Sequence, residues 1–426
     1  MTYRELFEGI DTKVKLSNGS YIIPINFDNG ATTPPLKSVV NTILEDIKYY
    51  GPIARGLGQK GDICTQKFEE AREDVLDFFN LKGNNTHTVV FTKSDTESLN
   101  LLANILIKDN DTKVLTTRME HHANDLPFRY KSQVLYVDVD TLGRINIDNI
   151  REKLIEHKGQ IKLVTITGAS NVTGYVNPIN EIAKICHENG AKIIVDAAQL
   201  VAHKEINMKG NTKDEQIDFL TFSAHKAYAP FGSGAVVGLT KDLQNVYPFL
   251  KGGGCVKGVF DDNVIWTSPP QLHEAGTQNF LGVMGMVKAL KDLKQIGFDN
   301  IQNHEFYIKD YLIKEMKKID NVIIYGDTED ISDRIGVISF NIKGMNYEEV
   351  AMKMANDMGI ALRCGKFCAH PYVYRLLGVS NINGYTDVVS DEENLGLIRV
   401  SLGLYNTIEE AKTFIKALQY IVLKNK

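Results

Sequence analysis

Short apolar runs alternate with segments whose apolar positions recur at helical spacing, mainly between residues 85 and 240. The runs that we expect to form strands are residues 88–92, 113–117, 133–137, 161–165, 192–195, 219–222 and 235–239. Helical segments over residues 97–108 and 178–189 lie between some of them, and the second ends in Asn189-Gly190, a common helix stop. This alternation predicts an α/β fold in which helices cover both faces of a mainly parallel sheet.

The pattern changes after residue 283. A long helical stretch over residues 283–319 is followed by shorter strands and helices, which predict a smaller α+β domain. We expect these at residues 321–325, 336–341, 347–358 and 397–402, with a last helix from Thr407. The chain is long enough for two hydrophobic cores. We therefore expect an N-terminal arm (1–24), a large domain (25–285) and a small C-terminal domain (286–426).

Composition narrows the class of protein. Hydrophobic residues make up 43% of the chain and charged residues 24%, as in ordinary soluble proteins. A net charge of -5 gives no reason to expect nucleic acid or an anionic membrane as a partner. The sequence has no apolar run long enough to cross a membrane and no signal-peptide pattern near its start. Five scattered cysteines favour free thiols in a reducing compartment, so we expect a cytoplasmic enzyme.

Two of the predicted strands end in polar groups that could act together. Asp196 follows one buried apolar strand, and Ser223, His225 and Lys226 follow the next. In sheets of this kind ligands lie at the carboxyl ends of the strands. A lysine there could form a Schiff base, Ser223 and His225 could bind a phosphate, and the buried carboxylate could pair with a pyridinium N–H. Taken singly, a helix-capping aspartate and an ordinary loop lysine are the simpler explanations.

The turn after the first predicted strand is rich in hydroxyl groups. Ser94, Asp95 and Thr96 precede a helix that we expect to begin near Glu97. Free N–H groups at a helix N-terminus can bind a phosphate group. A capping box without any ligand explains the same residues equally well.

A histidine pair follows the predicted strand at residues 113–117. The flat ring of His121 could stack on an aromatic cofactor, and a pair of surface histidines is the alternative. His121 and His122 also raise the question of a metal site. No carboxylate or cysteine stands at convincing ligand spacing, so we expect no metal there.

One thiol lies in a basic loop near the end of the chain. Arg363 and a glycine precede Cys368, and cationic surroundings favour the thiolate form of cysteine. Cys364, Cys368 and His370 could instead belong to a metal site, although no fourth ligand is nearby. Further on, Arg399 could hold a substrate carboxylate through two parallel hydrogen bonds, or form a structural ion pair.

Taken together, short motifs spanning residues 27–406 resemble the class V aminotransferase family, most closely its cysteine desulfurase and selenocysteine lyase branch. In order they are Phe27-Asp28-Asn29-Gly30-Ala31-Thr32-Thr33-Pro34, Arg55-Gly56, Glu120-His121-His122-Ala123-Asn124, Ser170-Asn171-Val172-Thr173-Gly174, Asp196-Ala197-Ala198-Gln199, Ser223-Ala224-His225-Lys226, Glu274-Ala275-Gly276-Thr277 and Arg399-Val400-Ser401-Leu402. Each motif is weak alone, whereas so many in this order are specific.

The resemblance implies the type I fold of transferases that depend on pyridoxal 5'-phosphate (PLP), acting as a homodimer. It implies that Lys226 carries the PLP and moves protons, while Asp196 pairs with the ring nitrogen. Gln199 would bond the ring hydroxyl, and His121 would stack on the ring. The phosphate group would lie at the turn that contains Asp95. Its ligands would be Thr96, Ser223, His225 and, from the other subunit, Thr277.

For the reaction, the resemblance implies a cysteine desulfurase that converts L-cysteine to L-alanine. Cys368 matches the persulfide-forming cysteine on the short loop of the group II enzymes, and its attack on sulfur would follow proton removal by Lys226. Asn171 and Arg399, with Arg363 close by, would hold the amino acid. A protein acceptor would then take the sulfur.

Two alternatives stay open at this point. The first is another class V PLP enzyme, either a C–S lyase (β-eliminase) or an aminotransferase, acting on a different amino acid. The second is a non-catalytic scaffold for sulfur transfer. The presence of Lys226, Asp196 and His225 counts against the scaffold, which would need none of them.

The sequence departs from the family pattern in several places. Ser94-Asp95-Thr96 stands where relatives commonly have Gly-Thr-Thr, and an acid beside a phosphate is unfavourable unless it turns away or finds a donor. The remaining departures are Ala54 in place of a histidine, Cys364 and Phe367 in place of polar residues, and residues 379–393, which resemble an insertion. They bear on the substrate more than on cofactor binding.

Overall fold

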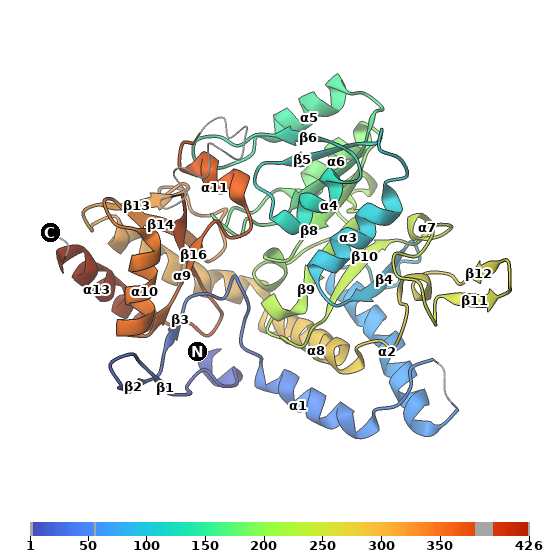
Figure 1. Cartoon of the computed structure of the whole chain (residues 1–426), viewed down its shortest axis with the longest axis horizontal. Helices are drawn as coiled ribbons and strands as arrows, with labels where there is room; N and C mark the ends of the chain where they lie inside the picture. Colours follow the sequence, from blue (N-terminus) through green and yellow to red (C-terminus); the bar gives the residue numbers. More distant parts are fainter. Residues whose placement is uncertain (1–2, 55–56, 380–394, 425–426) are drawn as a thin grey trace.

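The computed structural model describes residues 3–54, 57–379 and 395–424, and a seven-stranded sheet runs through the larger part of the molecule (Figure 1). The strand order is β4-β10-β9-β8-β7-β5-β6, and β10 alone runs against its neighbours. The bounds are β4 (His87–Thr92), β5 (Lys113–Thr117), β6 (Gln133–Val137), β7 (Ile161–Thr167), β8 (Lys192–Asp196), β9 (Phe219–Ser223) and β10 (Gly234–Leu239). The predicted α/β fold with a mainly parallel sheet is confirmed.

Helices cover both faces of this sheet, because successive side chains of a strand point to opposite sides. On β8, Ile193 and Val195 pack into one hydrophobic cluster, and Ile194 packs into another. The first cluster includes side chains from α1 (Lys37–Asp46), α2 (Gln59–Phe78), α5 (Ile147–Glu156), α6 (Ile179–Glu188) and α8 (Phe280–Ile296). The second includes side chains from α3 (Asp95–Leu106), α4 (Leu126–Arg129) and α7 (Thr240–Leu243).

The helical stretch predicted over residues 283–319 is two helices. α8 ends at Ile296 and α9 (Phe298–Met316) begins two residues later. Gly297 between them has a φ of +86°, a left-handed conformation that ends a helix and that glycine adopts without steric cost. The helical periodicity on both sides concealed this break.

The C-terminal domain is built on a four-stranded antiparallel sheet in the order β13-β14-β17-β16. Its strands are β13 (Val322–Tyr325), β14 (Val337–Ile342), β16 (Arg363–Gly365) and β17 (Leu397–Ser401), and α9, α10 (Tyr347–Met358) and α13 (Ile408–Lys424) pack against it. The sequence did not predict β16, which carries the first three residues of the basic loop. The short helix α11 (His370–Leu376) follows that loop.

The start of the chain is joined to this C-terminal domain. β3 (Ile25–Asn26) pairs with β15 (Ile360–Ala361), and Phe27 lies in the hydrophobic cluster of the domain. Two small hairpins complete the described structure, β1 (Val14–Lys15) with β2 (Tyr21–Ile22), and β11 (Val256–Val259) with β12 (Val264–Trp266). The domain boundaries at 24/25 and 285/286 stay predictions. No helix in the described ranges has the length and apolarity that a membrane crossing requires.

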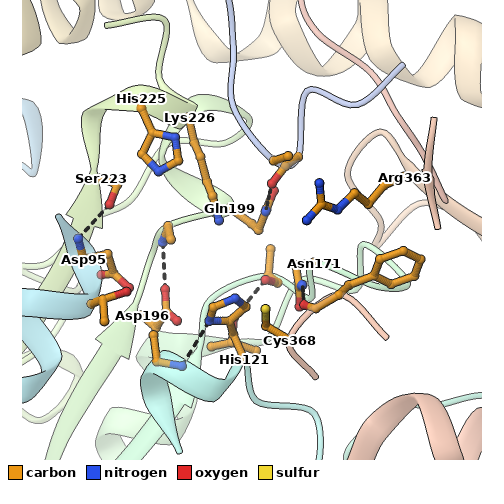
Figure 2. Close-up of a pocket in the computed structure, with 18 of the residues that line it drawn as sticks. Asp95, His121, Asn171, Asp196, Gln199, Ser223, His225, Lys226, Arg363 and Cys368 are labelled. Carbon is orange, nitrogen blue, oxygen red and sulfur yellow. Dashed lines mark hydrogen bonds between the residues drawn. The ribbon is translucent and has the colours of Figure 1, made fainter. Parts of the chain in front are cut away.

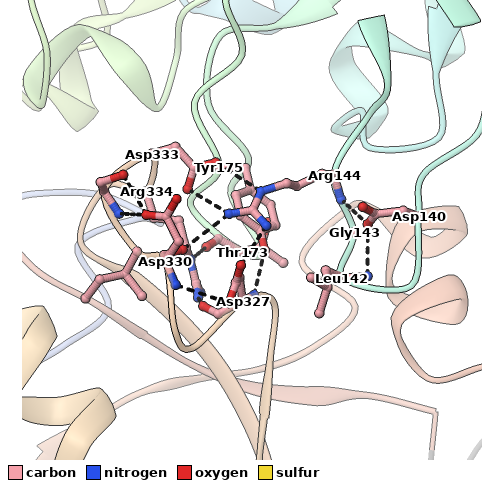
Figure 3. Close-up of polar contacts among 12 residues, drawn as sticks. Asp140, Leu142, Gly143, Arg144, Thr173, Tyr175, Asp327, Asp330, Asp333 and Arg334 are labelled. Carbon is pink, nitrogen blue, oxygen red and sulfur yellow. Dashed lines mark hydrogen bonds and ion pairs between the residues drawn. The ribbon is translucent and has the colours of Figure 1, made fainter. Parts of the chain in front are cut away.

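A polar junction joins the large domain to the C-terminal domain (Figure 3). Arg144 Nη1 lies 2.8 Å from the carboxylate of Asp327, and its Nε lies 3.1 Å from that of Asp333. In the other direction, Arg334 Nε donates to the carbonyl of Thr173 at 2.7 Å. The junction thereby fixes the loop after β7, which contains Asn171, relative to the C-terminal domain.

Candidate active site

A cavity of about 430 Å³ lies where the carboxyl ends of the central strands meet the C-terminal domain (Figure 2). It brings together all the predicted site residues except Thr277. They are Asp95, Thr96, His121, Asn171, Asp196, Gln199, Ser223, His225, Lys226, Arg363, Cys368 and Arg399. The carboxylate of Asp196 and the amine of Lys226 reach the cavity because β8 ends at Asp196 and β9 ends three residues before Lys226.

The amine of Lys226 faces the carboxylate of Asp196 across this cavity. Burial lowers the pKa of Lys226, and the negative charge of Asp196 acts against that effect. Asp196 is held in place because its Oδ1 accepts the N–H of Ala198 at 2.9 Å. A lysine whose neutral form is favoured in this way is a better nucleophile than an exposed lysine.

Hydroxyl groups and a helix N-terminus form one end of the cavity. Ser94 caps α3 by accepting the N–H of Glu97 at 3.3 Å, and Ser223 Oγ accepts the N–H of Asp95 at 2.7 Å. His225 Nδ1 lies 3.1 Å from the hydroxyl of Thr32. Burial and the nearby charge of Lys226 lower the pKa of His225 to about 4. Neutral donors at the start of a helix suit a phosphate group.

The ring of His121 lies on the cavity wall and is neutral. Its Nδ1 accepts the N–H of Ala123 at 3.1 Å, and burial, followed by the charge of Lys226, lowers its pKa to about 3. The preceding Glu120 fixes the turn by accepting hydrogen bonds from Thr117 and Asn124, both at 2.6 Å. A neutral, fixed imidazole is suited to stacking on a flat ring.

Arg399 enters the cavity from the C-terminal domain with one donor unused. Its Nη1 donates to the carbonyl of Asn171 at 2.9 Å, and its Nη2 donates to Asp28 at 3.0 Å. The side chain is 3% exposed, yet its Nε has no hydrogen-bond partner among the described residues. A buried donor without a partner is costly, so this atom marks a place where an anionic group would bind favourably.

The thiol of Cys368 is presented by an unusual backbone. Phe367 and Cys368 have φ angles of 50° and 54°, a region that costs non-glycine residues about 1–2 kcal/mol each. Two hydrogen bonds hold this conformation, from Asn171 Nδ2 to the Phe367 carbonyl (2.7 Å) and from His122 N–H to the Cys368 carbonyl (2.6 Å). Cys368 is exposed on the cavity wall, whereas Cys364 is half-buried and burial raises its pKa.

Other predicted residues lie elsewhere. Thr277 is exposed and lines a separate cavity of about 180 Å³, so its role in the site of a partner subunit stays a prediction. Glu274 of the same motif is buried and binds Arg72 at 2.7 and 2.8 Å, which is a structural role. Arg55 and residues 380–393 of the predicted insertion lie outside the described residues. In the described part of the chain, no group of three or more metal-ligating side chains occurs.

The sequence missed three residues that line the cavity or hold a residue of its wall. Asp28, the partner of Arg399, stands in a quoted motif but more than 370 positions away, so nothing in the pattern paired the two. Lys366 and Phe367 line the cavity next to the cysteine. The sequence could have indicated both residues, because they lie in the basic loop immediately before Cys368.

Comparison with known proteins identifies the family. Residues 25–414, nearly the whole chain, match the model of the aminotransferase class-V family. The chain belongs to the class V aminotransferase family. The predicted family is therefore confirmed.

Relatives of this class V protein include enzymes named cysteine desulfurases. The cysteine desulfurase of Haloferax volcanii is 30% identical over 403 residues, with 92% of this chain and 88% of that protein covered. A probable cysteine desulfurase of Pyrococcus abyssi is 33% identical over 411 residues, covering 93% of this chain and 94% of the relative.

Solved structures agree with the fold of this class V protein. The apo cysteine desulfurase of Thermococcus onnurineus NA1 superposes with a TM-score of 0.83 at 31% identity, covering 94% of this chain and 95% of that one. The Escherichia coli cysteine desulfurase CsdA gives a TM-score of 0.81 over 99% and 98% of the two chains; at 23% identity it supports the fold alone.

Proposed function

We propose that this protein is a PLP-dependent cysteine desulfurase that converts L-cysteine to L-alanine and retains the sulfur as a persulfide on Cys368. The observation that carries the proposal is the exposed thiol of Cys368 in the cavity that also holds the amine of Lys226 and Arg399, whose Nε has no partner within the described ranges. An amine, an anion-binding donor and a nucleophilic sulfur are the three groups that the reaction requires. The names of the relatives agree with it.

The residues of the cavity fit PLP. Lys226 would hold the cofactor covalently through Nζ, and the carboxylate of Asp196 would face the ring nitrogen. His121 would lie against the ring, and Ser223 with the N-terminus of α3 would bind the phosphate. Bound PLP supplies an electron sink that stabilises negative charge next to the substrate amino group. Gln199 donates to the Gly30 carbonyl at 2.8 Å, which leaves its amide oxygen to accept the ring hydroxyl.

The protein side chains would then perform the remaining tasks. Arg399, with the neighbouring Asn171, would bind the carboxylate of cysteine, since Arg399 Nε has no hydrogen-bond partner in the part of the chain that the structure describes. Lys226 would remove the proton from the α-carbon. Cys368, as a thiolate, would attack the sulfur of the substrate: an S–S bond forms, the C–S bond breaks, and the bonding electron pair passes to the carbon skeleton. Protonation of that skeleton gives alanine, with the sulfur left on Cys368.

The assembly and location of the protein belong to the same proposal. We expect a cytoplasmic homodimer in which Thr277 contributes to the phosphate site of the partner. Exposed apolar side chains on the neighbouring hairpin, Val259 and Phe260, support a covered surface in that region. The persulfide would be passed to a protein acceptor.

The proposal is tested by incubating the purified protein with L-cysteine and measuring alanine. Cys368→Ala should abolish alanine formation, while the matched control Cys364→Ala should retain it. Equal alanine formation by wild type and Cys368→Ala would exclude the persulfide role. Pyruvate or free sulfide in place of alanine would indicate a C–S lyase.

A further inference from the structure

Asp95 departs from the family pattern, and its side chain points into the protein. Its backbone N–H donates to Ser223 Oγ, so the residue stands at the proposed phosphate site. The carboxyl group, however, turns toward Asp196, and Figure 2 draws the two acids side by side. Asp95 is 5% exposed, lines the cavity, and its Oδ1 has no hydrogen-bond partner among the described residues.

The surroundings of this acid pair contain too little positive charge for two carboxylates. Lys226 is the cation that interacts with both acids. Arg399 is paired with Asp28, and His121 is neutral.

The other side chains around the pair are neutral or acidic. On β9, the register places Thr221 opposite Asp196, and its neutral hydroxyl contacts the carboxyl group of Asp95. Glu120, which precedes His121 in the chain, is a further buried acid. On α3 itself, Glu97 turns away and accepts the N–H of Lys93 at 2.6 Å. Two adjacent ionised acids in such a site are unfavourable, and one of them keeps its proton.

The proton belongs on Asp95. Burial and the charge of Asp196 raise the pKa of Asp95 well above its usual value. Burial also raises the pKa of Asp196, but the N–H of Ala198, the charge of Lys226 and the hydrogen bond from Asp95 all lower it. A shared proton therefore leaves Asp196 as the ionised member.

We propose that Asp95 is a positioning residue that stays protonated in the folded protein and donates a hydrogen bond to the carboxylate of Asp196. The pair then carries one negative charge, directed at the ring nitrogen of the cofactor, and the phosphate site carries none. A neutral Asp95 would not repel a phosphate group, so an acidic residue can occupy the turn that is proposed to bind the phosphate. Only the link to the cofactor rests on the proposed function, because the protonation state belongs to the protein without PLP.

The first test is infrared spectroscopy of the cofactor-free protein at neutral pH. The wild type should show the carbonyl stretch of a protonated carboxylic acid, and Asp95→Asn should lose that component. Burial also raises the pKa of Glu120, to about 8, so Glu120→Gln is the matched control and should remove a different component. An unchanged band in Asp95→Asn would overturn the proposal, whatever reaction the protein catalyses.

The second test is thermal unfolding of the same cofactor-free proteins across pH. The pKa of Asp95 is raised by folding, so the stability this group contributes is present at low pH and is lost as pH rises through the folded value. Asp95→Asn lacks this loss, and its melting temperature should exceed that of the wild type by a margin that grows with pH. Asp95→Thr, the residue common in relatives, serves as the second variant. A margin independent of pH in both variants would refute the shared proton.

Ionisation of Asp95 should also weaken the retention of PLP, which is measured by the visible absorbance of the bound cofactor. Above the folded pKa of Asp95, a second negative charge would weaken PLP binding by up to about tenfold per pH unit in the wild type relative to Asp95→Asn. Parallel pH profiles of the two proteins would contradict the proposed link to the phosphate site. Parallel profiles together with the expected loss of the carboxylic acid band in Asp95→Asn would support the shared proton and contradict only its effect on cofactor binding.

Discussion

The conformation of the cysteine loop should depend strongly on the side-chain amide of Asn171, one of the two groups that hold it. Its Nδ2 donates to the Phe367 carbonyl at 2.7 Å, and Phe367 and Cys368 both have positive φ angles. Two such residues cost about 2–4 kcal/mol together. Removing a buried donor costs about 1–3 kcal/mol, because the carbonyl is left without a partner. The two quantities are similar, so Asn171→Ala should allow the loop to leave the conformation that presents the thiol.

If the loop conformation that presents the thiol becomes less stable by about 1.4 kcal/mol relative to the others, the rate of the step that requires it falls tenfold. We therefore expect Asn171→Ala to lower the single-turnover rate of alanine formation by about tenfold or more at saturating cysteine. Asn171 is also a proposed substrate ligand, so the reaction of Cys368 with a small thiol reagent, measured without substrate in a Cys364→Ala background, isolates the loop. If that reaction rate and the single-turnover rate both match the parent protein, the amide does not hold the loop and the reasoning fails.

Three further predictions address the cofactor and the framework. Lys226→Ala should lose covalently bound PLP and its visible absorbance while keeping its circular dichroism; retention of that absorbance would contradict the role of the lysine. Glu274→Gln should lower the free energy of unfolding by about 1–3 kcal/mol in urea titrations, because the buried Arg72 would keep only the more exposed Glu69 as a charged partner. Arg144→Ala should cost about 1 kcal/mol or less per ion pair lost, since its pair with Asp327 is partly exposed; a larger loss would mean that the junction is more than a surface contact.

The sequence predicted the central sheet well because most of its strands are buried on both faces and are therefore largely apolar runs. The bounds of β5, which is buried after its first residue, were predicted as observed, and so were those of β6, a partly exposed edge strand. The polar residues after these runs also identified the cavity, since parallel strands bring their carboxyl ends to one edge. Asp196 and Lys226 follow neighbouring strands of the observed sheet for this reason.

Features set by tertiary contacts could not be predicted. β16 has only three residues, which is too few to show a periodic pattern. It forms because its backbone pairs with that of β17, with Arg363 opposite Arg399. The positive φ angles at Phe367 and Cys368 depend on hydrogen bonds from distant loops. The inward direction of Asp95 was one of two possibilities considered for an acid in that turn, and only its contacts with β8 and β9 decide between them.

The most direct test of the central claim is the location of the sulfur after one turnover. The protein would be treated with isotopically labelled L-cysteine, alkylated, digested and examined by mass spectrometry. We predict one labelled sulfur on the peptide that contains Cys368, in an amount equal to the alanine released, and none on the peptide from Cys368→Ala. Alanine released with no labelled sulfur on Cys368, or with the label on another cysteine, would contradict the proposed persulfide role.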